Sequence, residues 1–220
     1  MTPKELFPVL LAVAAAVGTA ATAAVMRKPT PLITLAELTA LTPTTRLTDE
    51  QRRQYLPLLN EALREWGITT PNRIAHALGQ WLHESWQFSA FKEIGPDVQR
   101  YANNPNLGNG GDVARALSYI GRGPTQLTGL ANYTRAGKAL GLDLVNVPEL
   151  AADPKHGFRI AGWYFREGNG DIAPIADKGT SVADIAAVTK KINGGTNGLA
   201  DREKYTAQVV ALLNKRGNKA

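Results

Sequence analysis

The 220-residue chain contains no cysteine, so disulfide bonds and thiolate chemistry are excluded. The absence of cysteine does not decide where the protein is located, because a bacterial or phage protein can function outside the cytoplasm without disulfides. The chain also lacks dense runs of lysine or arginine, although its formal net charge is +6. Its basic residues are not interleaved with aromatic ones, so we expect no nucleic-acid partner. The excess charge favours an anionic lipid or an anionic cell wall as partner, or serves solubility alone.

Metal-binding and nucleotide-binding motifs are missing as well. The three histidines, His76, His83 and His156, include no pair at the i, i+4 spacing of a zinc-hydrolase helix. The glycine-rich stretches GNGGD and GRGPTQ lack the Lys-Ser/Thr that completes a phosphate-binding loop. The sequence therefore predicts no metal and no cofactor.

Charged residues are absent from residues 6–26, LFPVLLAVAAAVGTAATAAVM. As a helix this stretch would extend about 31 Å, enough to cross the hydrocarbon core of a bilayer. A cleaved signal peptide, a permanent anchor and a releasable signal-anchor all fit the pattern. We expect residues 1–28 to form a membrane-inserted segment. It would anchor the protein at a membrane or export it to the periplasmic or cell-wall side, and a virion-associated phage protein is one such case.

Residues 29–47 are rich in proline and threonine, so we predict a linker with one short helical turn at LAEL. The folded domain is expected over residues 48–217 and to be mostly α-helical, because no strand-like alternation of useful length is present. A capping box formed by Thr48 and Gln51 predicts a helix that runs to Trp66. Helical patterns begin again at Pro71 and return at residues 128–140, 156–166, 181–193 and 200–215. Between these helices, residues 95–123 are predicted to form a long central loop.

A carboxylate stands near each end of HESWQFSAFKE, residues 83–93. Glu84 follows an apolar helix, and we expect Trp81, Leu82 and Trp86 to form an apolar pocket around it. Partial burial favours the protonated form of a carboxyl group, which is what a general acid at neutral pH requires.

Glu93 is the second candidate carboxylate. If the whole stretch were one helix, the α-carbons of Glu84 and Glu93 would stand about 13 Å apart along its axis. Gly95 and Pro96 indicate that the chain turns earlier and brings Glu93 back over the same cleft. An inverting glycosidase needs its two carboxyl groups about 6.5–9.5 Å apart. Two glutamates at a helix end are more often simply solvated, so the pair alone is a weak indication.

A polar, glycine-rich stretch, YIGRGPTQLTGLANY, covers residues 119–133. Its Gly-Arg-Gly sequence permits close approach of the backbone, and Arg122 offers a fixed fork of donors. A turn that merely precedes a helix needs no such polar run, so the stretch favours a binding site. The side chains that can orient a water molecule or bond sugar hydroxyls are Gln126, Thr128 and Asn132.

Together these stretches resemble glycoside hydrolase family 19, the chitinase-like enzymes, and particularly its branch of phage endolysins and bacterial chitinase-like proteins. The matching segments run in order from about residue 48 to residue 215. They read AHALGQWLHES, LGNGGD, YIGRGPTQLTGLANY, LGLDLVNVPELAADPKHGFRIAGWYF and KINGGTNGLADREKY. The resemblance implies a lysozyme-like helical domain that hydrolyses a glycosidic bond in a single inverting displacement.

The resemblance also implies roles for individual residues. Glu84 would be the acid that protonates the leaving glycosidic oxygen, Glu93 the base that activates water, and Thr128 a residue that holds this water. From their chemistry or from the resemblance, the residues expected to bind substrate or to support the catalytic network are His83, Trp86, Tyr119, Arg122, Gln126, Asn132, Asn193 and Arg202.

Two positions depart from the family pattern. Trp86 stands where a glycine usually follows the His-Glu-Ser motif, and we expect it to reshape or narrow the cleft. Gly95 stands where some phage members carry a threonine, so the handling of the catalytic water is less well specified than the acid. Both carboxylates are present, which is the pattern of an active enzyme.

Three functions remain open at this point. Chitin and the glycan of peptidoglycan share β-1,4-linked N-acetylated amino sugars, and one cleft can accept either. The basic charge, the apolar segment and the phage-type resemblance favour peptidoglycan, so we expect an endolysin or lysozyme-type glycosidase for cell-wall lysis or penetration. A chitinase that acts on chitin oligomers is the alternative. A non-catalytic, membrane-anchored virion protein is the third, and loss of Glu84 or Glu93 would be its sign.

Overall fold

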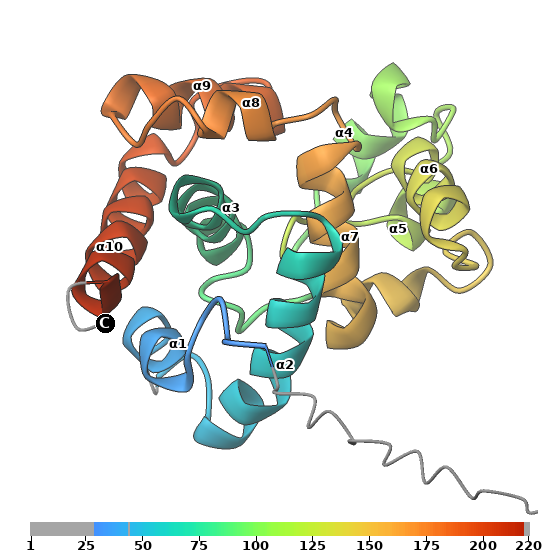
Figure 1. Cartoon of the computed structure of the whole chain (residues 1–220). Coiled ribbons are helices and arrows are strands. Elements are labelled where there is room, and N and C mark those ends of the chain that lie inside the picture. Colours follow the sequence, from blue (N-terminus) through green and yellow to red (C-terminus); the bar gives the residue numbers. More distant parts are fainter. Residues whose placement is uncertain (1–28, 44, 218–220) are drawn as a thin grey trace, which may run out of the picture. The chain divides into compact units, whose positions relative to one another are not determined.

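The computed structural model describes residues 29–43 and 45–217, and this part of the chain is mostly α-helical (Figure 1). Its helices are α1 (Leu35–Leu41), α2 (Asp49–Glu65), α3 (Pro71–Glu84), α4 (Val98–Asn103), α5 (Val113–Ser118), α6 (Leu130–Leu140), α7 (Pro154–Arg166), α8 (Ala173–Ala176), α9 (Val182–Asn193) and α10 (Leu199–Gly217), with the short 3-10 helices η1 (Pro105–Leu107) and η2 (Pro148–Ala152). Among these described residues, β-pairing is limited to isolated bridges. The predicted helical class is confirmed.

Capping residues set where several helices begin. The predicted box at the start of α2 is present: the Thr48 hydroxyl accepts from the Gln51 amide, and the Gln51 side chain accepts from the Thr48 amide. Pro71 occupies the first turn of α3, after the capping residue Thr70. The four later predicted helices correspond to α6, α7, α9 and α10, with ends shifted by no more than two residues.

Helix α3 lies in the middle of Figure 1, where it packs against α10, α7, α8 and α9, while α2 packs against α7. Its apolar stripe, including Ile74, Leu78 and Leu82, is buried as the periodicity predicts. The contact with α10 is close because Gly79 faces Thr206. A β-carbon at Gly79 would stand only 2.1 Å from the Thr206 hydroxyl oxygen. Helix α3 is therefore buried along its apolar stripe and packed closely against α10 at Gly79.

The predicted linker over residues 29–47 is wrong for most of its length, because residues from 31 onward belong to the compact domain. Thr34 and Glu37 form a capping box that starts α1, and Leu38 is fully buried in the core. The prolines and threonines suggested a linker, whereas Thr34 is a helix cap and the leucines between the threonines are core residues.

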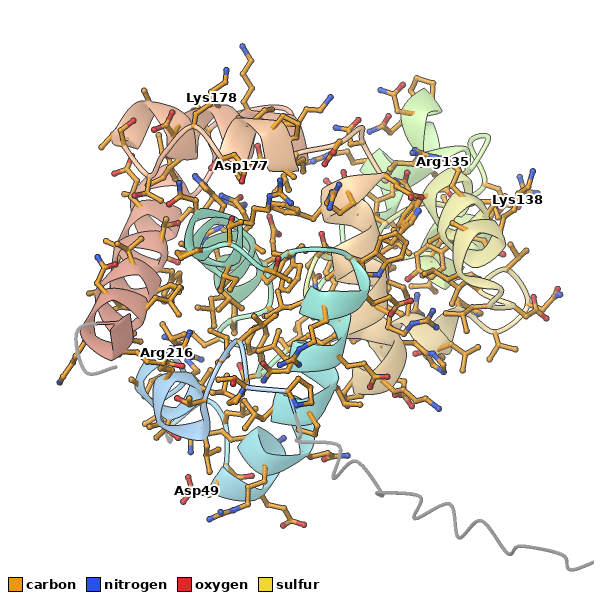
Figure 2. All side chains as sticks on the ribbon, in the orientation of Figure 1. Asp49, Arg135, Lys138, Asp177, Lys178 and Arg216 are labelled. Carbon is orange, nitrogen blue, oxygen red and sulfur yellow. The ribbon has the colours of Figure 1, made fainter. Side chains whose placement is uncertain are left out.

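Two polar side chains hold the start of this domain in place. The side-chain amide of Asn60 pairs with both backbone groups of Ile33, at 2.9 and 2.8 Å. Arg216, near the end of α10, donates to the carbonyls of Pro31 and Leu32 at 3.3 and 3.1 Å (Figure 2). We call Asn60 and Arg216 the entry clamp, because they fix the point at which the chain enters the domain.

The predicted long loop over residues 95–123 contains more structure than expected. Helix α4, the turn η1 and helix α5 lie within it, and the side chains of Asp97, Asn104 and Asp112 cap their first turns. The glycine and asparagine content obscured these short helices, although each begins at a typical capping residue.

Within residues 29–43 and 45–217, no helix is both long and apolar enough to cross a membrane. The segment predicted to do so, residues 6–26, lies outside the described residues. Its insertion into a membrane stays a prediction.

His76 is completely buried on α3 and is the packed histidine of this fold. Its Nε2 atom lies 2.7 Å from the carbonyl oxygen of Gly179, which fixes Nε2 as the protonated nitrogen. Nδ1 has no hydrogen-bond partner among the described residues. Burial lowers the pKa of the His76 imidazole, because a second proton would place an unsolvated charge in the core.

Acidification is expected to lower the free energy of unfolding through His76. Because the pKa of His76 is lowered in the native state, the unfolded chain takes up a proton that the native chain resists, and stability falls as the pH drops below 6.5. This one group adds at most about 1.4 kcal/mol per pH unit to the slope. Urea unfolding of the native protein and of His76→Gln across this range measures the effect. The variant should lose less stability on acidification, and equal slopes would contradict the assignment.

Candidate active site

One cleft of about 460 Å³ collects the two candidate carboxylates. Glu84 reaches it from the C-terminal end of α3, and Glu93 from the segment that follows. Polar residues from the Gly-Arg-Gly loop, α4, α6 and α9 complete its walls. The sequence-predicted residues that line this cleft are Glu84, Glu93, Gln126, Thr128, Asn132 and Asn193.

A left-handed turn reverses the chain between the two carboxylates, so the expected early turn is present. Trp86, Gln87 and Phe88 have φ angles of 48°, 60° and 64°. L-residues in this region cost about 1–2 kcal/mol each. Ser85 helps to hold the turn, since its hydroxyl donates to the Trp81 carbonyl at 2.6 Å and accepts from the Phe88 amide at 3.0 Å. Phe88 is also buried in an aromatic cluster of the core, which offsets part of the strain.

Arg202 of α10 holds Glu84. The Arg202 side chain is only 2% exposed, and its guanidinium donates to Oε1 of Glu84, to Oε1 of Gln80 and to the carbonyl of Asn197. Gln80 in turn donates to the Thr189 hydroxyl on α9 at 3.0 Å. A buried guanidinium is costly unless acceptors surround it, so this network fixes the carboxyl group of Glu84 relative to three helices.

Glu84 does not lie in the apolar pocket that we expected. Trp81 and Leu82 point into the core, and the groups near the Glu84 carboxylate are the Arg202 cation and Tyr164. Burial raises the pKa of the Tyr164 hydroxyl, and the negative charge of Glu84 contributes in the same direction. Helical periodicity identified which face of α3 is apolar, whereas the cation opposite Glu84 comes from a residue 118 positions later.

Glu93 is held by a different set of contacts. Its Oε1 accepts from the Tyr101 hydroxyl at 2.7 Å, and its Oε2 accepts from the Gly121 amide at 3.0 Å. The Glu93 amide also donates to the Gly121 carbonyl at 2.9 Å. Burial and then the hydrogen bond to Glu93 raise the pKa of Tyr101 to about 12, so its phenol remains a donor at neutral pH. The site therefore keeps two donors on this carboxylate.

The glycines of the Gly-Arg-Gly sequence are required by close packing. A β-carbon at Gly121 would lie 2.6 Å from Oε1 of Gln126 and 3.0 Å from Oε2 of Glu93. Gly123 has a φ of 73°, and a β-carbon there would lie 2.8 Å from the Ala151 carbonyl oxygen. The close backbone approach predicted from the sequence is therefore present at both glycines. At Gly121 the main chain approaches Gln126 and Glu93, and at Gly123 it approaches the buried main chain of Ala151.

The polar residues of this loop form a short chain of hydrogen bonds at the cleft wall. Gln126 has a left-handed φ of 50°, and its side chain donates to the Gly123 carbonyl at 3.1 Å. The Thr128 hydroxyl donates to the Gln126 carbonyl, and the Asn132 amide donates to the Thr128 carbonyl, both at 2.8 Å. The proton of the Thr128 hydroxyl is thus committed, which leaves its oxygen free to accept a hydrogen bond from the cleft.

Two residues predicted to contact substrate lie behind the cleft wall instead. Arg122 is 2% exposed and pairs with Glu149, with Nη2 and Oε1 2.6 Å apart. Its guanidinium lowers the pKa of the Glu149 carboxyl. The Tyr119 hydroxyl donates to the Val145 carbonyl at 2.9 Å, and its ring packs on Tyr133. Both side chains support the loop from within the protein. Donors near a Gly-rich turn can bond to other parts of the protein as well as to a ligand, so the sequence did not distinguish the two roles.

His83 and Trp86 also differ from the prediction. Nδ1 of His83 lies 2.9 Å from a carboxylate oxygen of Asp201, so this histidine ties α3 to α10. Trp86 lies outside the cleft and does not narrow it, since its indole ring faces the guanidinium of Arg46 on the surface. Arg202, predicted as a cleft residue, supports the site from beneath Glu84.

Tyr101 and Tyr164 both line the cleft, although neither was predicted as a site residue. Asp97 provided a signal for the first, since a helix capped there places Tyr101 one turn into α4. The other cleft residues that were not predicted are Arg100, Asn104, Leu107, Thr125, Leu127 and Ile192. Among residues 29–43 and 45–217, no group of three or more His, Asp or Glu side chains is arranged to hold a metal ion.

The sequence of this chain is similar to that of known chitinases. The sequence profile of the family described as "Chitinase class I" matches residues 69–198. An endochitinase of Arabidopsis thaliana is 35% identical over 130 residues, which are 59% of this chain and 41% of that protein. An acidic endochitinase of Petunia hybrida is 33% identical over 165 residues, covering 64% of this chain and 61% of that protein. The chain thus spans less than half of the Arabidopsis relative.

The fold is similar to that of solved chitinase structures. Chitinase C of Streptomyces griseus superposes with a TM-score of 0.66 over 85% of this chain and 95% of that chain, at 21% sequence identity. At this level of identity the likeness concerns the fold alone. It agrees with the helical architecture that the motifs implied.

Gly121→Ala is expected to destabilise the protein by about 1–3 kcal/mol, because the added β-carbon collides with Gln126 and Glu93. The backbone at Gly121 is not left-handed, so the effect is one of space. Gly195→Ala is the matched control, as its nearest foreign atom would lie 4.0 Å away. Thermal unfolding and a crystal structure of the variant measure the loss and the displacement of Glu93. Equal stability of the two variants would contradict the steric account.

Proposed function

Because this chain belongs to glycoside hydrolase family 19, we propose that it hydrolyses β-1,4 bonds between N-acetylated amino sugars with inversion at the anomeric carbon. The observation that carries this proposal is the position of Glu84 and Glu93 on one cleft, each held by its own set of donors. An inverting mechanism needs one carboxylic acid at the leaving oxygen and one carboxylate beside a water molecule.

Glu84 is the proposed acid. Arg202 occupies Oε1, so the other carboxyl oxygen, Oε2, is the one that carries the transferred proton. When the glycosidic oxygen leaves, it takes this proton and Glu84 becomes an anion beside Arg202. The hydrogen bond from Arg202 to a neutral carboxyl group thus becomes an ion pair as the reaction proceeds, and an interaction that strengthens toward the transition state accelerates the chemical step.

Glu93 is the proposed base. Tyr101 and Gly121 fix both of its oxygens by donating to them, so the carboxylate is held in one orientation. A water that donates one hydrogen to Glu93 and the other to Thr128 keeps a lone pair directed at the sugar. The Thr128 hydroxyl suits this role, because its own proton is used in the bond to Gln126. Gln126, Asn132 and Asn193 then supply polar contacts to the substrate.

We propose peptidoglycan as the principal substrate, for lysis or penetration of a bacterial cell wall. The net charge of +6 supports an anionic polymer, and the uncharged segment 6–26 supports attachment or export close to the wall. Chitin is the second candidate, because the relatives described above carry the names endochitinase and acidic endochitinase. The two polymers share the bond that the proposed carboxylates would act on.

Glu84→Gln is expected to lower kcat on the preferred polymer by about 10²–10⁴-fold with little change in KM, because it removes the transferable proton while keeping the shape of the side chain. Glu93→Gln should act in the same direction. Glu167→Gln, an exposed glutamate after α7, is the control. Purified sacculi and chitin oligomers serve as substrates, with proton NMR of the first product to read the anomer.

Three outcomes of this experiment are informative. Equal turnover by native protein and Glu84→Gln would remove the acid assignment. A first product with retained anomeric configuration would exclude the inverting mechanism. Cleavage of chitin oligomers without release of sugars from sacculi would replace peptidoglycan by chitin as the substrate.

Tyr101→Phe is expected to lower kcat by about tenfold to a hundredfold, since a hydrogen bond to a charged group contributes about 1.5–3 kcal/mol. The loss arises because Glu93 keeps only the donor from Gly121 and moves from its position beside water. Tyr55→Phe on α2 is the matched control, with the same atom removed away from the cleft. Unchanged kcat in Tyr101→Phe would show that Gly121 alone positions the carboxylate.

A further inference from the structure

Trp86 combines two unfavourable features at one surface position. It is 59% exposed, although a tryptophan side chain gains more from burial than any other. It also has a φ of 48°, in the region that L-residues normally avoid. A residue held in such a conformation is strained, and residues of this kind cluster at active sites and ligand-binding sites.

One positive charge lies directly on the ring of Trp86. The guanidinium of Arg46 stacks on the indole, 5.5 Å from the ring centroid. Arg46 also lies near Tyr205 of α10, and the Lys204 ammonium stands 5.6 Å from the ring of that tyrosine. Arg46 and Lys204 are exposed. Asp201 also lies near Tyr205, and its carboxylate is bonded to His83.

The position of Trp86 relative to the cleft follows from the chain itself. Trp86 is two residues after Glu84, so their α-carbons are at most about 7.6 Å apart. Trp86 does not line the cleft, so its exposed ring lies outside the part of the site that holds the two carboxylates. An exposed aromatic ring this close in the chain to the proposed acid offers a flat apolar face to a sugar ring.

We propose that Trp86 and Arg46 form a glycan-binding platform outside the cleft, which stacks on a sugar ring and binds a carboxylate carried by the same strand. The proposal rests on the glycosidase function proposed above and selects a substrate class within it. Peptidoglycan strands bear carboxylates on their peptide stems, whereas chitin is uncharged. Because Arg46 is already stacked on the Trp86 indole, its guanidinium N–H groups are held next to the ring on which the sugar would stack. These groups can donate to a carboxylate there.

The test measures binding separately from cleavage. Full-length protein with Glu84→Gln is sedimented with purified sacculi or with chitin particles. Trp86→Gly and Arg46→Gln are then added to this background. Glycine suits the left-handed backbone, so Trp86→Gly removes the ring without adding strain. The controls are Leu117→Ala, another exposed apolar residue, and Lys178→Ala, an exposed cation at the end of α8 (Figure 2).

Trp86→Gly is expected to weaken binding to sacculi by about tenfold, as is Arg46→Gln, while both controls bind like the Glu84→Gln parent. Binding to chitin should depend on Trp86 and change less than about twofold with Arg46→Gln, because chitin offers no carboxylate. Sacculi whose carboxylates have been amidated should no longer distinguish Arg46→Gln from its parent.

Two results would overturn the platform. In the first, Trp86→Gly and Arg46→Gln bind sacculi as tightly as the controls. In the second, Arg46→Gln weakens binding to chitin and to amidated sacculi as much as to native sacculi, which would make the arginine a support for the ring only. Turnover of sacculi and chitin by the native protein is measured in parallel. Absence of turnover on both would reject the proposed function, while the binding series still decides the platform.

Discussion

The buried charge of Arg202 is the constraint on which the arrangement of the site depends. A guanidinium taken out of water is costly unless anions and acceptors surround it, and Arg202 finds them on α3 and in the turn before α10. The charge therefore couples the packing of α3 and α10 to the position of the Glu84 carboxylate. In the proposed mechanism this contact becomes an ion pair as Glu84 gives up its proton, so the packing of α3 against α10 and the proposed chemistry share one contact.

The second carboxylate is placed by a different kind of structure. Glu84 stands on a long helix, whereas Glu93 follows a strained reversal and is fastened to the main chain of Gly121 and to Tyr101. The two carboxylates are thus held by separate sets of contacts and reach the same cleft. The left-handed turn ends the helical rise that would have kept the two residues apart, so two carboxylates only nine positions apart in the sequence line the same cleft.

Much of this architecture was predictable from local patterns. Periodicity and capping boxes located α2, α3, α6, α7, α9 and α10, and the motifs identified the family together with Glu84, Glu93 and the loop residues on the cleft wall. Two of the wrong predictions share one cause, because the direction in which a side chain points depends on partners distant in the sequence. Arg122 turns inward to Glu149, and Trp86 turns outward to Arg46. Tyr101 was overlooked because a short helix capped by Asp97 was hidden among glycines and asparagines.

The entry clamp has a mechanical consequence. Arg216 grips the chain at Pro31 and Leu32, and the same helix carries Arg202 near its opposite end. Helix α10, about 28 Å long, therefore links the start of the domain to the residue that holds Glu84. Glu93 is held by Tyr101 and Gly121 instead. A displacement of α10 at the entry clamp would thus act directly on one carboxylate and not on the other.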